Sequence, residues 1–168
     1  MDRMISFVLT ASALVFGIFL SGGEVVAQTA RDIVGMWTLV SVTLEQDGKK
    51  TNMYGANPQG QAIFAPNGRF LIMFIRSDVT KFASGNREAG TPKENRAAVR
   101  GSIAYFGAYS VSETHRVIIY HVEGSTFPNW RDADQKPLFK LSGGELTLTN
   151  PVPSNGSGTG YSVWKRVK

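Results

Sequence analysis

The chain has 168 residues, with 18 lysines and arginines against 13 acidic residues, a net charge of +5 and no cysteine. The absence of cysteine excludes disulfide scaffolds, thiolate zinc sites, iron–sulfur clusters, thiol catalysis and cysteine-linked lipid anchors. A hydrophobic content of 42% is ordinary for a globular protein, and the length indicates one domain.

The first 27 residues have the pattern of a secretory signal peptide. Arg3 precedes the almost unbroken apolar run 5–20, and Val25 and Ala27 place small residues at the −3 and −1 positions of a cleavage site. This run is shorter than the roughly 20 residues that a spanning helix needs, which favours cleavage over an uncleaved membrane anchor. We therefore expect a mature domain of residues 28–168 that is periplasmic or secreted, without stable membrane insertion.

Basic residues are spread along the mature chain. Only Lys49-Lys50 and Lys165-Arg166 are adjacent basic pairs. A nucleic-acid-binding protein gathers such residues on one face and places aromatic residues between them. The distribution predicts a solvated basic surface and no nucleic-acid partner.

Eight segments have the pattern of β-strands, with turn signals between them such as Asp47-Gly48, residues 66–68 and Gly143-Gly144. The segments are residues 36–45, 60–65, 69–76, 102–112, 115–123, 135–141, 145–149 and 160–167. Residues 150–160, rich in Pro, Gly and Ser, are predicted as a flexible loop. Eight sequential antiparallel strands predict an all-β fold, an up-and-down β-barrel with room for side chains or one small ligand.

One short helix is predicted over residues 91–101. Thr91 and Glu94 fit a capping box, Pro92 suits the first helical position, and Gly101 can end the helix. The strand at 69–76 is apolar on both faces, unlike a barrel wall with one face in water. We expect the helix to cover these outer side chains of the barrel or to close one of its open ends.

Several stretches resemble a known family. Gly35-Met36-Trp37 looks like the Gly-x-Trp signature of lipocalins, in which a basic residue of the last strand packs across the Trp; Lys165 or Arg166 stands in the matching place. More specifically, three segments together resemble the lipocalin-like domain family of bacteria and fungi: residues 54–60, 104–109 and 121–130. The resemblance extends from about residue 32 to residue 167. It implies a small β-barrel with an internal cavity and structural roles for Trp37 and Arg166, but no reaction.

One polar cluster stands out among the predicted strands. His121 and Glu123 are two residues apart and therefore share a face, and Tyr105 and Tyr109 share a face of the preceding strand. Whether the two pairs meet on one face depends on the turn around residues 113–114. One extra turn residue places Tyr105 near Glu123, and the pattern leaves both turn lengths open.

Two functions fit these residues, beside a purely structural role. The preferred one is a non-enzymatic binder of a small apolar or amphipathic molecule, because the chain has no cofactor motif and one polar cluster. Its ligand contacts would be Tyr105, Tyr109, His121, Glu123 and Trp130. The alternative is a cavity enzyme (an isomerase, cyclase or hydrolase) in which His121, Glu123 and Tyr105 form an acid–base set.

Neither a metal nor a cofactor is expected. His115 and His121 are the only histidines. Six residues along a strand span about 20 Å, too far for one ion. His121 with Glu123 lacks an obvious third ligand. The chain has no Gly-x-Ser-x-Gly elbow after a strand, and the glycine-rich residues 156–160 lack the strand–helix context of a nucleotide loop.

Overall fold

The computed structural model describes residues 29–168. The predicted signal peptide and its cleavage site after Ala27 lie outside the described residues. Within this part of the chain, no helix is both long and apolar enough to cross a membrane.

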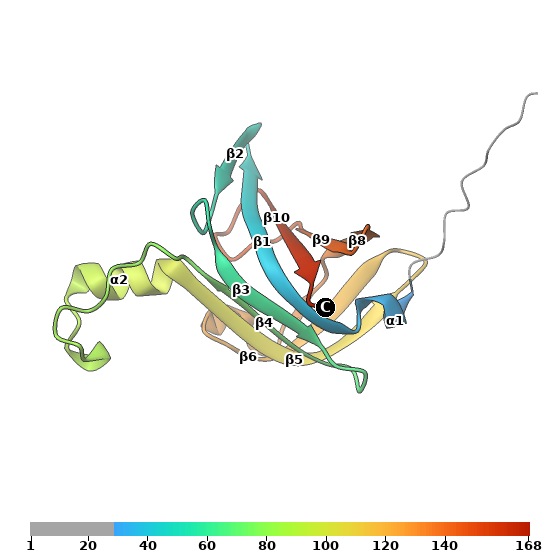
Figure 1. The fold of residues 1–168 in the computed structure, drawn as a ribbon, viewed down its shortest axis with the longest axis horizontal. Helices are drawn as coiled ribbons and strands as arrows, with labels where there is room; N and C mark the ends of the chain where they lie inside the picture. The colour runs from blue at the N-terminus through green and yellow to red at the C-terminus, as the bar shows by residue number, and fades with distance from the viewer. Residues whose placement is uncertain (1–28) are drawn as a thin grey trace, which may run out of the picture.

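The described residues form a closed antiparallel β-barrel of eight strands, which confirms the predicted fold class (Figure 1). Each barrel strand pairs with the next along the chain, and the last pairs with the first to close the wall. The strands are β1 (Gly35–Gln46), β3 (Gln59–Phe64), β4 (Arg69–Ile75), β5 (Ser102–Ser112), β6 (Val117–Ser125), β8 (Leu138–Ser142), β9 (Glu145–Asn150) and β10 (Thr159–Arg166).

Two short strands extend this wall beyond what the sequence predicted. β2 (Lys49–Asn52) pairs with the end of β1, and β7 (Asp134–Gln135) pairs with β6. The predicted strand 135–141 is divided into β7 and β8 around Pro137, which has no N–H to donate to a ladder. Its carbonyl still accepts a hydrogen bond from the Ile118 N–H at 3.0 Å, so the chain stays attached to β6.

Three short helical segments were also not predicted: α1 (Ala30–Ile33), η1 (Arg87–Ala89) and η2 (Pro128–Trp130). The strand predicted to begin at His115 begins at Val117 instead. The residues before it form a turn in which Arg116 has a φ of 52°, a left-handed backbone that cannot continue a strand.

Trp37 plugs one end of the barrel. Its side chain is fully buried, and its indole Nε1–H donates a hydrogen bond of 2.9 Å to the carbonyl of Ile33 in α1. Of the two basic residues considered for the stack, Arg166 lies over the ring, with its guanidinium carbon 4.2 Å from the ring centroid. Lys165 is the neighbouring residue on β10 and pairs with Thr38.

Arg166 also ties the chain before β1 to the last strand. One of its N–H groups donates to the Val34 carbonyl at 2.8 Å, and another donates to the Asp32 carbonyl. A Cβ atom at Gly35 would lie 2.8 Å from the Arg166 Nη1 atom, and the φ of Gly35 is +135°. Only glycine fits here, which gives the Gly of the Gly-x-Trp pattern a physical reason.

The helix α2 (Pro92–Gly101) forms with the predicted capping box, in which the Glu94 N–H donates to Thr91 Oγ1 at 3.3 Å. Of its two predicted positions, the one over the barrel wall is wrong; the end of the helix, at Val99 and Arg100, borders a hollow at one end of the barrel. The helix runs directly into β5 at Ser102, so it extends off the end of that strand instead of folding back across the sheet (Figure 1).

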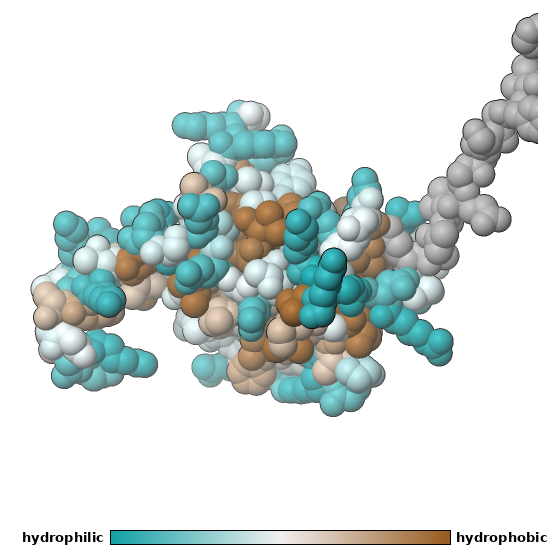
Figure 2. All heavy atoms as spheres, viewed as in Figure 1, coloured by the Kyte–Doolittle hydropathy of each residue, from teal (hydrophilic) through white to brown (hydrophobic). Residues whose placement is uncertain are grey.

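The outer face of β4 is consequently uncovered. Phe70, Ile72 and Phe74 point into the core, as one face of the doubly apolar strand was expected to do. On the other face Leu71 remains 42% exposed and pairs with Phe106 on β5, which is 48% exposed. Figure 2 shows apolar side chains gathered on the viewed face of the barrel. We expected another segment to cover this outer face, and among residues 29–168 none does.

Candidate functional site

The two ends of the barrel are built differently. At one end, which we call the closed end, the strands are joined by short turns at residues 65–68, 113–116 and 143–144, and α1 lies beside them (Figure 1). At the other, which we call the open end, the long connections gather. They are residues 47–58, 76–101, 126–137 and 151–158.

A cavity of about 70 Å³ lies inside the barrel at the open end. Aliphatic side chains of Val42, Ile103 and Leu148 form part of its wall. Aromatic side chains form much of the rest, namely Tyr54, Phe74, Tyr105, Tyr120, Trp130 and Tyr161. Among the described residues, no Asp, Glu, Lys, Arg or His lines this cavity. It is therefore suited to apolar surface and neutral polar groups.

Tyr105 is held at the centre of this wall by aromatic neighbours. Its ring meets Trp130 edge to face at 5.1 Å between centroids, and meets Phe70 in the same manner at 5.7 Å. Trp130 is placed by η2 and packs in turn against Phe127 at 5.8 Å. Such perpendicular contacts fix ring orientations, so the shape of the wall is set before any ligand enters.

Burial keeps the tyrosines of the wall neutral. It raises the pKa of Tyr54 to about 12 and raises the pKa of Tyr105 and of Tyr120 further. At ordinary pH each phenol keeps its proton and can donate a hydrogen bond. Gln135, also buried in this wall, offers an amide with both donors and an acceptor.

A wider hollow of about 400 Å³ shares Met53, Tyr54, Ile103 and Ser154 with the inner cavity. It reaches the end of α2, where Val99 is 77% exposed and Arg100 brings a positive charge. The two hollows therefore adjoin at these shared residues.

The structure places two of the predicted ligand contacts, Tyr105 and Trp130, in the cavity wall. Tyr109 lies elsewhere. Its hydroxyl donates to the Ala65 carbonyl at 3.1 Å, and its ring packs edge to face on Phe64 at 5.2 Å, both in the closed half of the barrel.

His121 and Glu123 do not meet the tyrosines, so the expected cluster does not form. The turn between β5 and β6 has four residues, and this length puts His121 on the face opposite Tyr109. Tyr109 therefore pairs with Tyr120, and the β6 residues that point inward are Ile118, Tyr120 and Val122.

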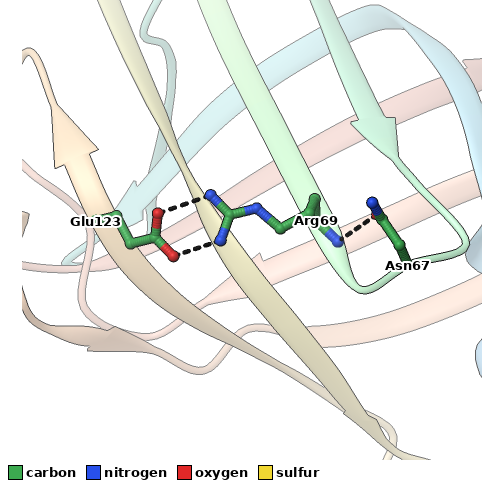
Figure 3. Close-up of polar contacts among 3 residues, drawn as sticks. All are labelled: Asn67, Arg69 and Glu123. Atoms are coloured by element: carbon green, nitrogen blue, oxygen red, sulfur yellow. Dashed lines mark hydrogen bonds and ion pairs between the residues drawn. The ribbon is translucent and has the colours of Figure 1, made fainter.

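Both residues of the polar pair are engaged on the outside of the wall. His121 Nδ1 lies 2.7 Å from an Asp134 carboxylate oxygen. Glu123 receives two hydrogen bonds from the Arg69 guanidinium, one of them 2.7 Å from Nη2 to Oε2, and Asn67 accepts from the Arg69 backbone N–H (Figure 3). These bonds from Arg69 hold the pKa of Glu123 below its usual value.

The acid–base set of His121, Glu123 and Tyr105 is thus divided between the two faces of the sheet. The other histidine, His115, is exposed in the β5–β6 turn beside Ser112. Within residues 29–168, no group of three or more His, Cys, Asp or Glu side chains comes close enough to hold a metal ion.

Most residues of the wall were not predicted as ligand contacts, among them Tyr54, Tyr120 and Gln135. A signal for Tyr120 was present in the sequence, since Ile118, Tyr120 and Val122 form the more apolar alternate set of that strand. Tyr54 lies outside the predicted strands and Gln135 is the first residue of one, so alternation along a strand carried little signal for either.

This fold and site define a small β-barrel that is closed at one end and has an aromatic cavity at the other. The chain belongs to the lipocalin-like domain family, whose model matches residues 34–167. It is also similar to the 4'-hydroxy-3'-methoxypropiophenone carrier protein ppsC of Aspergillus oryzae (strain ATCC 42149 / RIB 40). The two are 28% identical over 88 residues, a match that covers 47% of this chain and 79% of that protein.

Proposed function

We propose that this protein is a non-catalytic binder or carrier that takes a small apolar or amphipathic molecule into the cavity at its open end. The observation that carries the proposal is the aromatic wall around Tyr105 and Trp130, without a charged side chain among the described residues. The similar fungal protein is named a carrier of a small aromatic ketone, which supports carriage of a small molecule here.

The size of the cavity limits the expected affinity. A ligand the size of one aromatic side chain buries roughly 200 Å², which contributes about 5 kcal/mol before the cost of association. We therefore expect dissociation constants in the millimolar range for single-ring compounds. Larger ligands would extend into the outer hollow beside Val99 and Arg100.

Two substitutions in one loop test the location of binding. Ser154 lines both the cavity and the outer hollow, whereas Ser157 is exposed in the same Pro/Gly/Ser-rich loop and lines neither. Ser154→Trp should block the entrance, and Ser157→Trp is the matched control for the added bulk.

The measurement is native mass spectrometry of the protein isolated from its own host. We expect a co-purifying small molecule on the wild type and on Ser157→Trp, and its loss on Ser154→Trp. Equal retention by both variants would place the ligand outside this cavity and contradict the proposal.

We further propose that the protein works outside the cytoplasm, after removal of residues 1–27. Support comes from the apolar run 5–20 and from the small residues before Gln28. The exported protein should have the mass of a chain beginning at Gln28, with or without cyclisation to pyroglutamate. A membrane-bound form that retains Met1 would contradict this.

A further inference from the structure

We propose that the Tyr120 hydroxyl is the polar anchor of the cavity, and that the ligand is a neutral, flat molecule carrying a hydrogen-bond acceptor such as a carbonyl oxygen. This inference rests on the proposed function and names the class of ligand.

The first observation is that this hydroxyl has no partner. Among the buried side-chain nitrogen and oxygen atoms of residues 29–168, the Tyr120 oxygen is the one without a hydrogen bond. Other buried polar groups are paired: the Trp37 indole donates to Ile33 and the Trp164 indole to Ser162. An unpaired buried hydroxyl costs free energy, which a ligand acceptor would recover.

The second observation is the location of the Tyr120 side chain. Tyr120 forms part of the cavity wall and is 1% exposed. Its ring packs at 4.5 Å between centroids on Phe70 and at 6.1 Å on Tyr105. The hydroxyl is thus shut off from bulk water among aromatic rings. A flat ligand that stacks on these rings can present one polar atom to it.

The third observation concerns charge. The cavity wall holds no cationic side chain to pair with a ligand anion and no carboxylate to pair with a ligand cation, and Arg100 lies only in the outer hollow. A charged group buried without a partner is strongly disfavoured. The raised pKa values of Tyr105 and Tyr120 agree with an interior that disfavours negative charge. A carbonyl needs only a donor, and a neutral phenol supplies one.

Three probes of similar size separate these features: acetophenone has the carbonyl, α-methylstyrene replaces its oxygen by CH₂, and benzoate is anionic. Without an anchor, α-methylstyrene would bind more tightly than acetophenone, because it loses no hydrogen bonds with water on entry. With the anchor, calorimetric titration at pH 7 should show acetophenone binding about tenfold more tightly than α-methylstyrene. Benzoate should bind most weakly.

Tyr120→Phe then removes the hydroxyl and keeps the ring. We expect a loss of about tenfold in acetophenone affinity and no loss for α-methylstyrene. Tyr109→Phe is the matched control, since its hydroxyl is bonded to Ala65 in the closed half and should not affect either probe. Circular dichroism of each variant confirms folding, and the order of the probes on the wild type tests the anchor without any substitution.

The outcomes separate this inference from the function on which it rests. Binding of both neutral probes with α-methylstyrene the tighter, or an acetophenone affinity unaffected by Tyr120→Phe, would overturn the anchor and leave the binder standing. Tightest binding of benzoate would overturn the neutral class of ligand. Binding of no probe would overturn the inference together with the proposed function.

Discussion

The closed and open ends of this barrel use aromatic side chains for different purposes. At the closed end, Trp37 is fully buried, its indole N–H is paired with Ile33, and Arg166 covers its ring. At the open end, Tyr105, Tyr120 and Trp130 line a cavity, and the Tyr120 hydroxyl is unpaired.

Together with the proposed function, the difference assigns stability mainly to one end of the fold and binding to the other. Short turns let the closed end pack tightly and satisfy its polar groups locally. The long connections gather at the open end, and the cavity lies among the side chains there. We expect substitutions at the closed end to lower mainly the free energy of unfolding, and those at the open end to lower mainly ligand affinity.

The largest effect should come from Trp37→Ala. Removal of a fully buried ring from a filled end should lower the free energy of unfolding by about 3–5 kcal/mol. Trp130→Ala, which removes a ring less completely buried than that of Trp37, should cost less but weaken binding of a neutral aromatic probe. Urea unfolding of both variants measures this. A Trp37→Ala protein as stable as the wild type would remove the distinction between the ends.

The second largest effect should come from alkaline pH, which should lower the free energy of unfolding through the buried tyrosines of the open end. Burial raises the pKa of Tyr54 to about 12, whereas the pKa of tyrosine in an unfolded chain is about 10. Below pH 10 both states are protonated and the free energy of unfolding is unaffected. Above it the unfolded chain loses protons first, so this free energy should fall by about 2 kcal/mol per buried tyrosine by pH 12.

Tyr54→Phe is the matched variant for this pH effect, and it should make the alkaline fall shallower. The measurement is urea unfolding from pH 8 to pH 12, with tyrosine ionisation followed by ultraviolet absorbance. Ionisation of all five tyrosines near pH 10 in the folded protein would contradict the buried wall.

A smaller effect should distinguish the two basic residues at the closed end. Arg166→Gln removes hydrogen bonds to the Val34 and Asp32 carbonyls together with the stack on Trp37. We expect a loss of about 1–2 kcal/mol in the free energy of unfolding. Lys165→Gln, one residue earlier on β10, should have almost no effect. Equal losses would mean that only the charge matters, not the geometry.

Substitutions on the outer wall should have the least effect of all. His121→Gln and Glu123→Gln change side chains that face solvent beside Asp134 and Arg69. Exposed pairs of this kind contribute little to stability. Neither variant should alter the affinity for acetophenone. A marked loss in either would place a binding surface on the outside of the barrel.

Much of the wall followed from local sequence patterns. Alternation over residues 36–45 matches β1, and residues 66–68 form the predicted turn, in which Gly68 takes a φ of 78°. The capping box of Thr91 and Glu94 was also predictable. Each of these features depends on residues that are close together in the sequence, so local patterns were enough to predict it.

The site was less predictable because it depends on register and on the direction of long connections. The turn at residues 113–116 decides which β6 side chains face the cavity, and residue types alone did not reveal its length. The capping box begins α2 but does not direct its axis, so its position beyond the wall was missed. Tyr105 was predicted from the face it takes on the strand 102–112, and Trp130 lies in a segment that carries the family resemblance. Tyr120 was not singled out, although it belongs to the more apolar alternate set of its strand, and its pairing with Tyr109 shows that this set faces inward.

The most direct test of the open end as the binding site uses the three tryptophans as reporters. Each has one indole N–H signal in a proton–nitrogen NMR spectrum, and the rings lie at the closed end (Trp37), in the core beside Phe74 (Trp164) and in the cavity wall (Trp130). Titration with acetophenone should shift the Trp130 signal most, the Trp164 signal less and the Trp37 signal not at all. A shift confined to Trp37, or no shift in any of the three, would contradict this account.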